Sequence, residues 1–188
     1  MFRNRSLLIV VILSAFTIST FAQSNKKGWS KEVTVVASKA NEKVSMEGDL
    51  AKGKIIEDLS WASSSSNACF PATQNLKYRG NHVFFATTIP ARSILRIKVI
   101  PTDKSANMSL YAYMIGGNSF DEVPDLPRCI TCESDEKWDR PWRGKTQNHE
   151  RKVEFQNPTQ NTYNIFIGVA APKDVITGKF SVEIELES

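Results

Sequence analysis

GKFSVEIEL, residues 178–186, is the stretch that decides the fold class of this chain. Its apolar residues Phe180, Val182, Ile184 and Leu186 alternate with the polar residues Lys179, Ser181, Glu183 and Glu185. Successive side chains of a β-strand point to opposite faces of the sheet. The alternation therefore predicts a strand with one face on a core and the other face in water.

The rest of the chain repeats this pattern, or has short runs of β-branched and aromatic residues that are typical of strands. These runs predict strands at 31–38, 54–61, 82–89, 93–100, 108–115, 152–155 and 163–169. Residues 41–50 are ambiguous, and no stretch has the 3.6-residue period of an amphipathic helix. Short strands separated by Gly and Pro predict an all-β fold, either an antiparallel β-sandwich of the jelly-roll kind or a barrel. We expect one domain over 31–188, with a flexible lead-in at 23–30 and a long loop at 118–150.

The first 22 residues have the three parts of a secretory signal peptide. Arg3 and Arg5 supply a positive start, the apolar run 7–13 follows, and Thr20-Phe21-Ala22 ends in a small residue. A retained membrane anchor is the alternative, but the apolar run is shorter than the roughly 20 residues that span a bilayer. We expect cleavage after Ala22, a secreted or periplasmic location, and a mature chain without a transmembrane segment.

The charge balance argues against a nucleic-acid partner. The chain has 24 Lys and Arg against 20 Asp and Glu, a net charge of +4. Arg3 and Arg5 leave with the leader, so the mature chain has 22 basic against 20 acidic residues, a net charge of +2. A nucleic acid or an anionic membrane would need a clustered basic face, whereas the charges here are interspersed along the chain.

Five segments, in this order, resemble the bacterial pre-peptidase C-terminal (PPC-type) β-sandwich over residues 81–186. They are Val83-Phe84-Phe85, Leu95–Val99 (LRIKV), Met108–Tyr111 (MSLY), Tyr163–Val169 (YNIFIGV) and Gly178–Val182 (GKFSV). Two stretches depart from the family pattern, the long loop at 118–150 and the segment 60–80. PPC-type domains are non-catalytic, accompany secreted enzymes and can bind matrix polymers, sometimes with calcium. The resemblance thus implies an accessory or binding role.

Acidic residues are concentrated between residues 121 and 139. They form a candidate calcium site made of Asp121, Glu122, Asp125, Glu133, Asp135 and Asp139, with Glu136 beside them. Calcium takes about six to eight oxygen ligands, which clustered carboxylates on a loop can supply. The alternative is a solvated acidic loop, because the spacing of an EF-hand is missing. Calcium is the one cofactor that the sequence suggests, and none is required.

Trp138 and Trp142 flank Arg140 and are the candidate ligand contacts. Exposed indoles beside an arginine form a platform for a polysaccharide or a protein. The alternative, which the usual burial of large aromatic residues favours, is that both indoles fold back over the end of the sandwich.

The mature chain has three cysteines, Cys69, Cys129 and Cys132, so at least one thiol stays free of an internal disulfide. We predict a disulfide from Cys69 to Cys132, with Cys129 as the alternative partner, that pins the long loop to the domain. A redox site at Cys129 and Cys132 would need a helix N-terminus. A zinc site with His82 or His149 would need a second pair of closely spaced ligands.

Catalytic motifs are missing from the sequence. His82 and His149 are its only histidines, and it has no G-x-S-x-G nucleophile elbow. We expect His82 to be structural or at the surface, and His149 to be solvated. The sequence therefore predicts a non-catalytic binding or accessory module for a polymer or protein partner. A small secreted hydrolase with its site around residues 121–150, and a structural protein of the cell envelope, are the alternatives.

Overall fold

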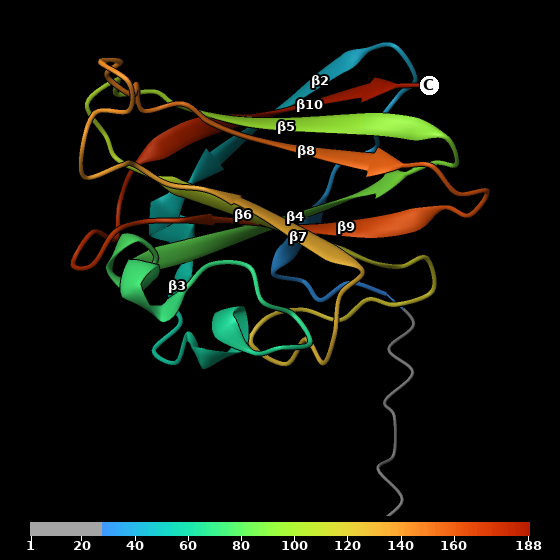
Figure 1. Ribbon diagram of the computed structural model, residues 1–188, viewed down its shortest axis with the longest axis horizontal. Helices are drawn as coiled ribbons and strands as arrows, with labels where there is room; N and C mark the ends of the chain where they lie inside the picture. The colour runs from blue at the N-terminus through green and yellow to red at the C-terminus, as the bar shows by residue number, and fades with distance from the viewer. Residues whose placement is uncertain (1–27) are drawn as a thin grey trace, which may run out of the picture.

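The computed structural model describes residues 28–188, which form two β-sheets packed face to face (Figure 1). Sheet A contains β1 (Val33–Val35), β3 (Lys54–Ile55), β4 (Asn81–Ile89), β6 (Ser109–Gly116), β7 (Thr131–Asp135) and β9 (Tyr163–Ala170). Sheet B contains β2 (Lys43–Asp49), β5 (Ser93–Pro101), β8 (Arg151–Asn157) and β10 (Lys179–Glu187). The strand orders are β1-β4-β9-β6-β7, with β3 also on β4, and β2-β10-β5-β8. Only the β1–β4 pair among these is parallel, so the predicted antiparallel β-sandwich is confirmed.

The predicted strand at 178–186 is β10, which lies in the interior of sheet B. Val182 is in register with Met46 of β2 on one side and with Val99 of β5 on the other. The ambiguous segment 41–50 is largely strand, as β2. The predicted leader at 1–22 lies outside the described residues. Within the described residues, no helix is both long enough and apolar enough to cross a membrane.

Two expectations about local structure were wrong. The strand predicted at 54–61 ends at Ile55, and a 3-10 turn, η2 (Ser60–Ser63), follows it. Asp58 causes this turn, because its carboxylate accepts hydrogen bonds from the backbone N–H (2.8 Å) and the hydroxyl (2.9 Å) of Ser60. The loop expected at 118–150 contains a strand, β7, which pairs with β6 at the edge of sheet A.

The main core lies between the two sheets. Sheet B contributes the apolar side of its alternating strands, including Phe180, Val182 and Ile184 of β10, all fully buried. Sheet A contributes the inward side of β4, β6 and β9, such as Ile165 and Ile167. This core is the one that the alternation of β10 predicts.

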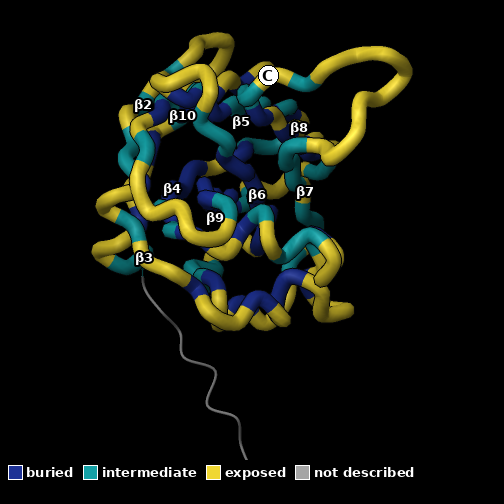
Figure 2. The backbone as a smooth tube through the Cα atoms, turned by 90° about the vertical axis from the view of Figure 1, so that its left-hand side faces the viewer, coloured by how far each residue is buried: buried dark blue, intermediate teal, exposed yellow. Residues whose placement is uncertain are grey.

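Sheet A is also buried on its other side, by a layer that we call the cover, residues 56–80 and 118–130. The cover forms a second core with the outward side chains of β4, β6 and β9, rich in the aromatic residues Trp61, Phe70, Tyr78, Tyr111, Tyr113 and Phe166. Figure 2 shows buried stretches below β6 and β9, inside the exposed turns of this layer. Gly168 of β9 makes room for the Tyr111 ring, which occupies the space that a side chain at 168 would need. The molecule therefore has three layers.

The start of the described chain belongs to this second core. Trp29 stacks on Phe166 with 5.9 Å between ring centroids, and Ser30 donates two hydrogen bonds of 2.7 Å to the Glu122 carboxylate. Trp29 and Ser30, in the stretch where we expect a flexible lead-in, therefore contact sheet A and the cover. The physical reason is that Trp29 covers apolar surface of sheet A that water would otherwise meet.

Candidate binding site

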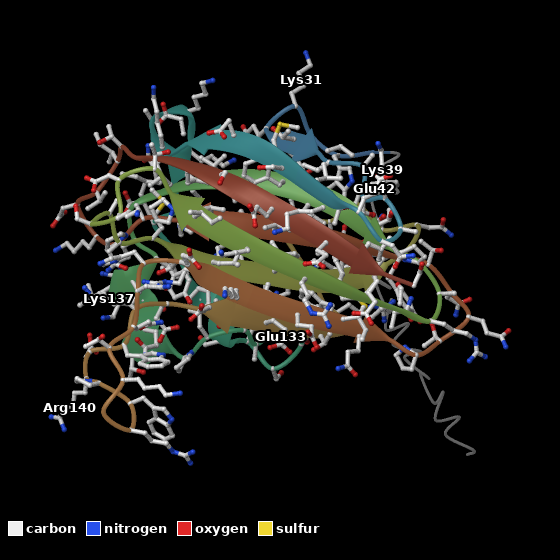
Figure 3. All side chains as sticks on the ribbon, turned by 90° about the horizontal axis from the view of Figure 1, so that it is seen from above. Lys31, Lys39, Glu42, Glu133, Lys137 and Arg140 are labelled. Atoms are coloured by element: carbon white, nitrogen blue, oxygen red, sulfur yellow. A yellow bond between two sulfur atoms is a disulfide. The ribbon has the colours of Figure 1, made fainter. Side chains whose placement is uncertain are left out.

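The connection from β7 to β8, residues 136–150, leaves the body of the sandwich and is here called the arm. It joins the edge of sheet A to the edge of sheet B. Figure 3 shows Arg140 at the outer end of a projecting loop, with Lys137 nearer the strands. Trp138, Arg140 and Trp142, the predicted contact residues, all lie on this arm.

Gln147 closes the base of the arm. Its side-chain oxygen accepts from the Trp138 backbone N–H at 2.5 Å, and its amide nitrogen donates to the Glu136 carbonyl at 2.9 Å. Nearby, Asp135 accepts from the backbone N–H of Lys152 at 2.9 Å. Burial raises the pKa of Asp135, although this hydrogen bond and the nearby cationic side chains oppose the rise. The two sides of the arm are thus tied together where they leave the sheets.

Arg151 is a second anchor of the arm, and it is fully buried. Its Nε donates to the Met108 carbonyl at 2.8 Å, and its Nη1 donates to the carbonyls of Asn148 (2.9 Å) and Glu150 (2.8 Å). Its Nη2 donates to Asn107 Oδ1 at 3.1 Å. Each terminal group of the buried guanidinium therefore has an acceptor, as a buried charge requires. Sequence reasoning missed Arg151, although its place on the apolar side of β8 (RKVEFQN) was a readable signal.

The tip of the arm is a two-residue hairpin turn. The Trp142 N–H donates to the Lys145 carbonyl at 3.2 Å, and the Lys145 N–H donates to the Trp142 carbonyl at 2.9 Å. Arg143 and Gly144 between them have φ values of +48° and +73°. Positive φ at both central residues is the signature of a type I′ turn, which normally takes Asn, Asp or Gly. Arg143 is therefore an unusual residue for its backbone conformation.

Trp138, Arg140 and Trp142 line one open hollow with a volume of about 370 Å³. The exposed fractions of the two tryptophans are 43% and 60%. The expectation that both indoles fold back over the sandwich was therefore wrong. The hydrogen-bonded base and the hairpin set the conformation of the arm, in which both rings stay partly in water. Arg143 stacks on Trp142, with its guanidinium carbon 5.4 Å from the ring centroid.

The arm is a local concentration of positive charge. Its outer part, residues 137–145, contains Lys137, Arg140, Arg143 and Lys145 and one acid, Asp139, which forms an ion pair with Lys77. The other two acids of the arm, Glu136 and Glu150, lie at its base. Basic and acidic residues are interspersed along the whole sequence, but on the outer part of the arm the basic residues are in excess.

His149, at the foot of the arm, is half-buried, although we expected a solvated residue. Burial and the nearby cations Lys137 and Arg151 lower its pKa. Its Nδ1 has no hydrogen-bond partner among the described residues.

The predicted calcium ligands are dispersed over separate elements. Four of them have partners of their own: Glu122 binds Ser30, Asp121 binds Ser119, Asp135 binds the backbone of Lys152, and Asp139 pairs with Lys77. The other two are Glu133, which is exposed on β7, and Asp125, which follows Pro124 in the cover. Among residues 28–188, no three Asp, Glu, His or Cys side chains are grouped so that they could hold a metal ion. Calcium binding stays a prediction.

The disulfide from Cys69 to Cys132 is confirmed, with 5.2 Å between the Cα atoms. It joins the cover to β7, the strand that leads into the arm. Cys129 is a free, half-buried thiol whose pKa is raised by burial.

His82 is the buried structural histidine that we expected as one of two alternatives. Its Nε2 lies 2.6 Å from the Tyr78 carbonyl, so Nε2 carries the proton and Nδ1 accepts from the Tyr111 hydroxyl at 3.0 Å. Burial lowers the pKa of His82 to about 4.

Comparison with known proteins finds similar structures but no matching sequences. No family model matches this chain, and no curated protein matches it. PliG from Aeromonas hydrophila, a periplasmic lysozyme inhibitor, is 9% identical, with a TM-score of 0.42, over 83% of this chain and 98% of its own. The pre-peptidase C-terminal domain of a Bacillus anthracis collagenase is 10% identical, with a TM-score of 0.37, over 83% of this chain and 95% of its own. CorA from Methylomicrobium album, a surface-associated copper-binding protein, is 10% identical, with a TM-score of 0.41, over 82% of this chain and 98% of its own.

A PPC-type domain is therefore among the solved structures that this chain is similar to, in agreement with the resemblance seen in the sequence. Similarities of this strength assign no ligand or activity to the chain. The candidate site depends on the arm itself.

Proposed function

We propose that this chain is an exported, non-catalytic binding module that holds a polymeric partner with its arm. The observation that carries the proposal is the hollow between two half-exposed tryptophans, Trp138 and Trp142, at the end of a loop that projects from the sandwich. Large apolar rings in water cost free energy that a packed domain normally avoids, so exposed pairs of them mark contact sites.

The base of the arm supports this function. A binding loop loses less conformational entropy on binding when its conformation is already set. Gln147 bridges the two sides of the arm, Arg151 binds the carbonyls of its return strand, and Lys77 pairs with Asp139. The disulfide at Cys132 fixes β7 immediately before it. The arm thus presents the rings of Trp138 and Trp142 in a conformation that is set before the ligand binds.

The proposal is tested by retention of the purified protein on insoluble polymers: cellulose, chitin, peptidoglycan and collagen. We expect the wild type to be depleted from solution by at least one of them, and the double variant W138A/W142A to stay in solution. Leu76→Ala is the matched control, because Leu76 is an apolar residue of the cover that is 57% exposed. Thermal unfolding of each variant verifies that the fold is kept.

Retention of the double variant at the wild-type level on every polymer would contradict the proposal, as would a wild type that binds no polymer, insoluble or soluble. Turnover of ester, peptide or glycoside substrates that is lost in His149→Ala would favour the hydrolase alternative instead. Measuring thermal unfolding with calcium and with a chelator tests the calcium prediction separately, because a bound ion raises the apparent stability.

A further inference from the structure

From the charge and shape of the arm, and resting on the proposed function, we infer that its ligand is an acidic glycan. By this we mean a sugar polymer that carries carboxylate or sulfate groups. Three features of the arm lead to this class of ligand: its unpaired cations, the residue at its turn, and the shape of its hollow.

The cations of the arm have no carboxylate partners. In the described part of the chain, no ion pair involves Lys137, Arg140, Arg143 or Lys145. On sheet B, by contrast, Arg96 is paired with Glu154 and Glu187. Asp139, the acid on the outer part of the arm, is already paired with Lys77, which lies outside the arm. Glu150, at the base of the arm, is likewise paired with a lysine outside it, Lys98. The outer part of the arm, residues 137–145, thus presents four cations beside a single acid that is already paired, and its positive field favours an anionic ligand.

The turn at the tip has an arginine where the backbone favours a different residue. Arg143 has a φ of +48°, a conformation that Gly and Asn adopt more easily than a long side chain does. An unfavourable residue at an exposed turn is a sign of a functional constraint. Here the arginine adds a cation and covers one side of the Trp142 ring.

The hollow between the indoles distinguishes a glycan from a lipid surface. Trp138 and Trp142 line a concave space with Arg140, rather than forming a convex wedge. The C–H face of a sugar ring stacks on an indole, so a space that two indoles line suits a sugar ring. Arg140 lines the same space, where its guanidinium can form paired hydrogen bonds to a carboxylate or sulfate. Insertion into a bilayer would instead bring the rings to one outward surface.

The test measures affinities of the purified protein for polygalacturonate, dextran sulfate and neutral dextran, and for phosphatidylcholine vesicles with and without phosphatidylglycerol. We expect binding to at least one acidic glycan that is about tenfold or more tighter than to dextran and that weakens with added salt. Arg140→Gln and Arg143→Asn should each weaken this binding by roughly fivefold to tenfold. Asn tolerates a positive φ, so the second variant removes the charge and keeps the turn.

Arg96→Gln is the control, because it removes a cation from the outer face of sheet B and should leave affinity unchanged. Measurable affinity that is equal for polygalacturonate, dextran sulfate and dextran would overturn the acidic ligand and leave the proposed polymer binding intact. Binding to anionic vesicles without binding to either acidic glycan would overturn it in favour of a lipid. A loss in Arg96→Gln as large as in the arm variants would show that the arm is not the site. Failure of both this test and retention on insoluble polymers would sink the proposed function as well.

Discussion

The outward side chains of the two sheets have opposite surroundings, water on sheet B and a second core on sheet A. On sheet B most outward side chains are polar and partly in water, and Arg96 lies between the carboxylates of Glu154 (2.8 Å) and Glu187 (2.7 Å) on neighbouring strands. On sheet A the outward side chains are largely aromatic, and the cover buries them. Seven consecutive residues of β6, from Ser109 to Ile115, are buried, whereas buried and more exposed residues alternate along β10.

This difference between the two outer faces predicts which substitutions lower the free energy of unfolding. Buried rings of the cover lose dispersion contacts and leave cavities when they are truncated. Ion pairs between half-exposed side chains gain little over their interactions with water. Changes to the cover should therefore be costly, and changes to the outer face of sheet B should be tolerated.

The largest effect is expected for Phe70→Ala in the cover. Phe70 is 3% exposed and stacks on Tyr78 with 3.8 Å between ring centroids. Truncation should lower the free energy of unfolding by about 3–5 kcal/mol, as for other buried phenylalanines. Urea denaturation measures this, with the exposed Leu76→Ala as control. A loss as small as that of the control would mean that the cover is not part of the cooperative fold.

Removing the disulfide between the cover and β7 should lower the free energy of unfolding by as much as Phe70→Ala does, or by slightly less. The bond closes a loop with a sequence separation of 63 residues. Loop-closure entropy for this length corresponds to about 4 kcal/mol of lost stability in Cys69→Ser. Cys129→Ser, which keeps the bond, is the matched control in the same denaturation experiment. Equal stability of the two variants would contradict the structural role of the bond.

Acidification should destabilise the covered side through His82. Its pKa is lowered from 6.5 to about 4 by burial, so between these pH values the unfolded chain binds more protons than the folded chain. The free energy of unfolding should therefore fall by roughly 3 kcal/mol from this group as the pH drops from 6.5 to 4. His82→Gln should flatten this part of the pH profile whatever its absolute stability. An unchanged slope in that variant would show that another group controls the acid response.

The smallest effect is expected on the outer face of sheet B. Arg96→Ala removes two ion pairs, but its side chain is 41% exposed and its partners are at least as exposed. Differential scanning calorimetry should find a shift in melting temperature of less than about 3 °C. A shift in melting temperature as large as that of Phe70→Ala would contradict the expectation that the outer face of sheet B contributes less to stability than the cover.

Sequence reasoning described the outer face of sheet B better than that of sheet A. In β10 the alternation alone identifies the strand and its inner face. In β6 the continuous run MSLYAYMI also predicts a strand, but a run that is apolar on both faces does not say what covers the second face. The segment 60–80 stood out only as a departure from the PPC-type pattern, because its short 3-10 turns have no periodicity to read.

The same limit applies to the candidate site. The composition of the arm pointed to Trp138, Arg140 and Trp142, and cysteine counting pointed to Cys69 and Cys132. The expected burial of the indoles was wrong, because burial of a ring depends on whether another element reaches it. The anchors Gln147 and Arg151 were missed, since their partners are backbone groups whose positions the sequence does not specify.

The sequence by itself determined the all-β class and the positions of β5, β8 and β10 in sheet B, and it favoured the cysteine pair that the structure joins. These follow from side-chain period and composition, which are properties of neighbouring residues. Only the tertiary structure decided that one face of the sandwich is covered, that the acids of 121–139 are dispersed, and that the segment with four cations and two indoles projects from the sheets as an arm. Those outcomes depend on distances between residues far apart in the chain, and packing sets these distances.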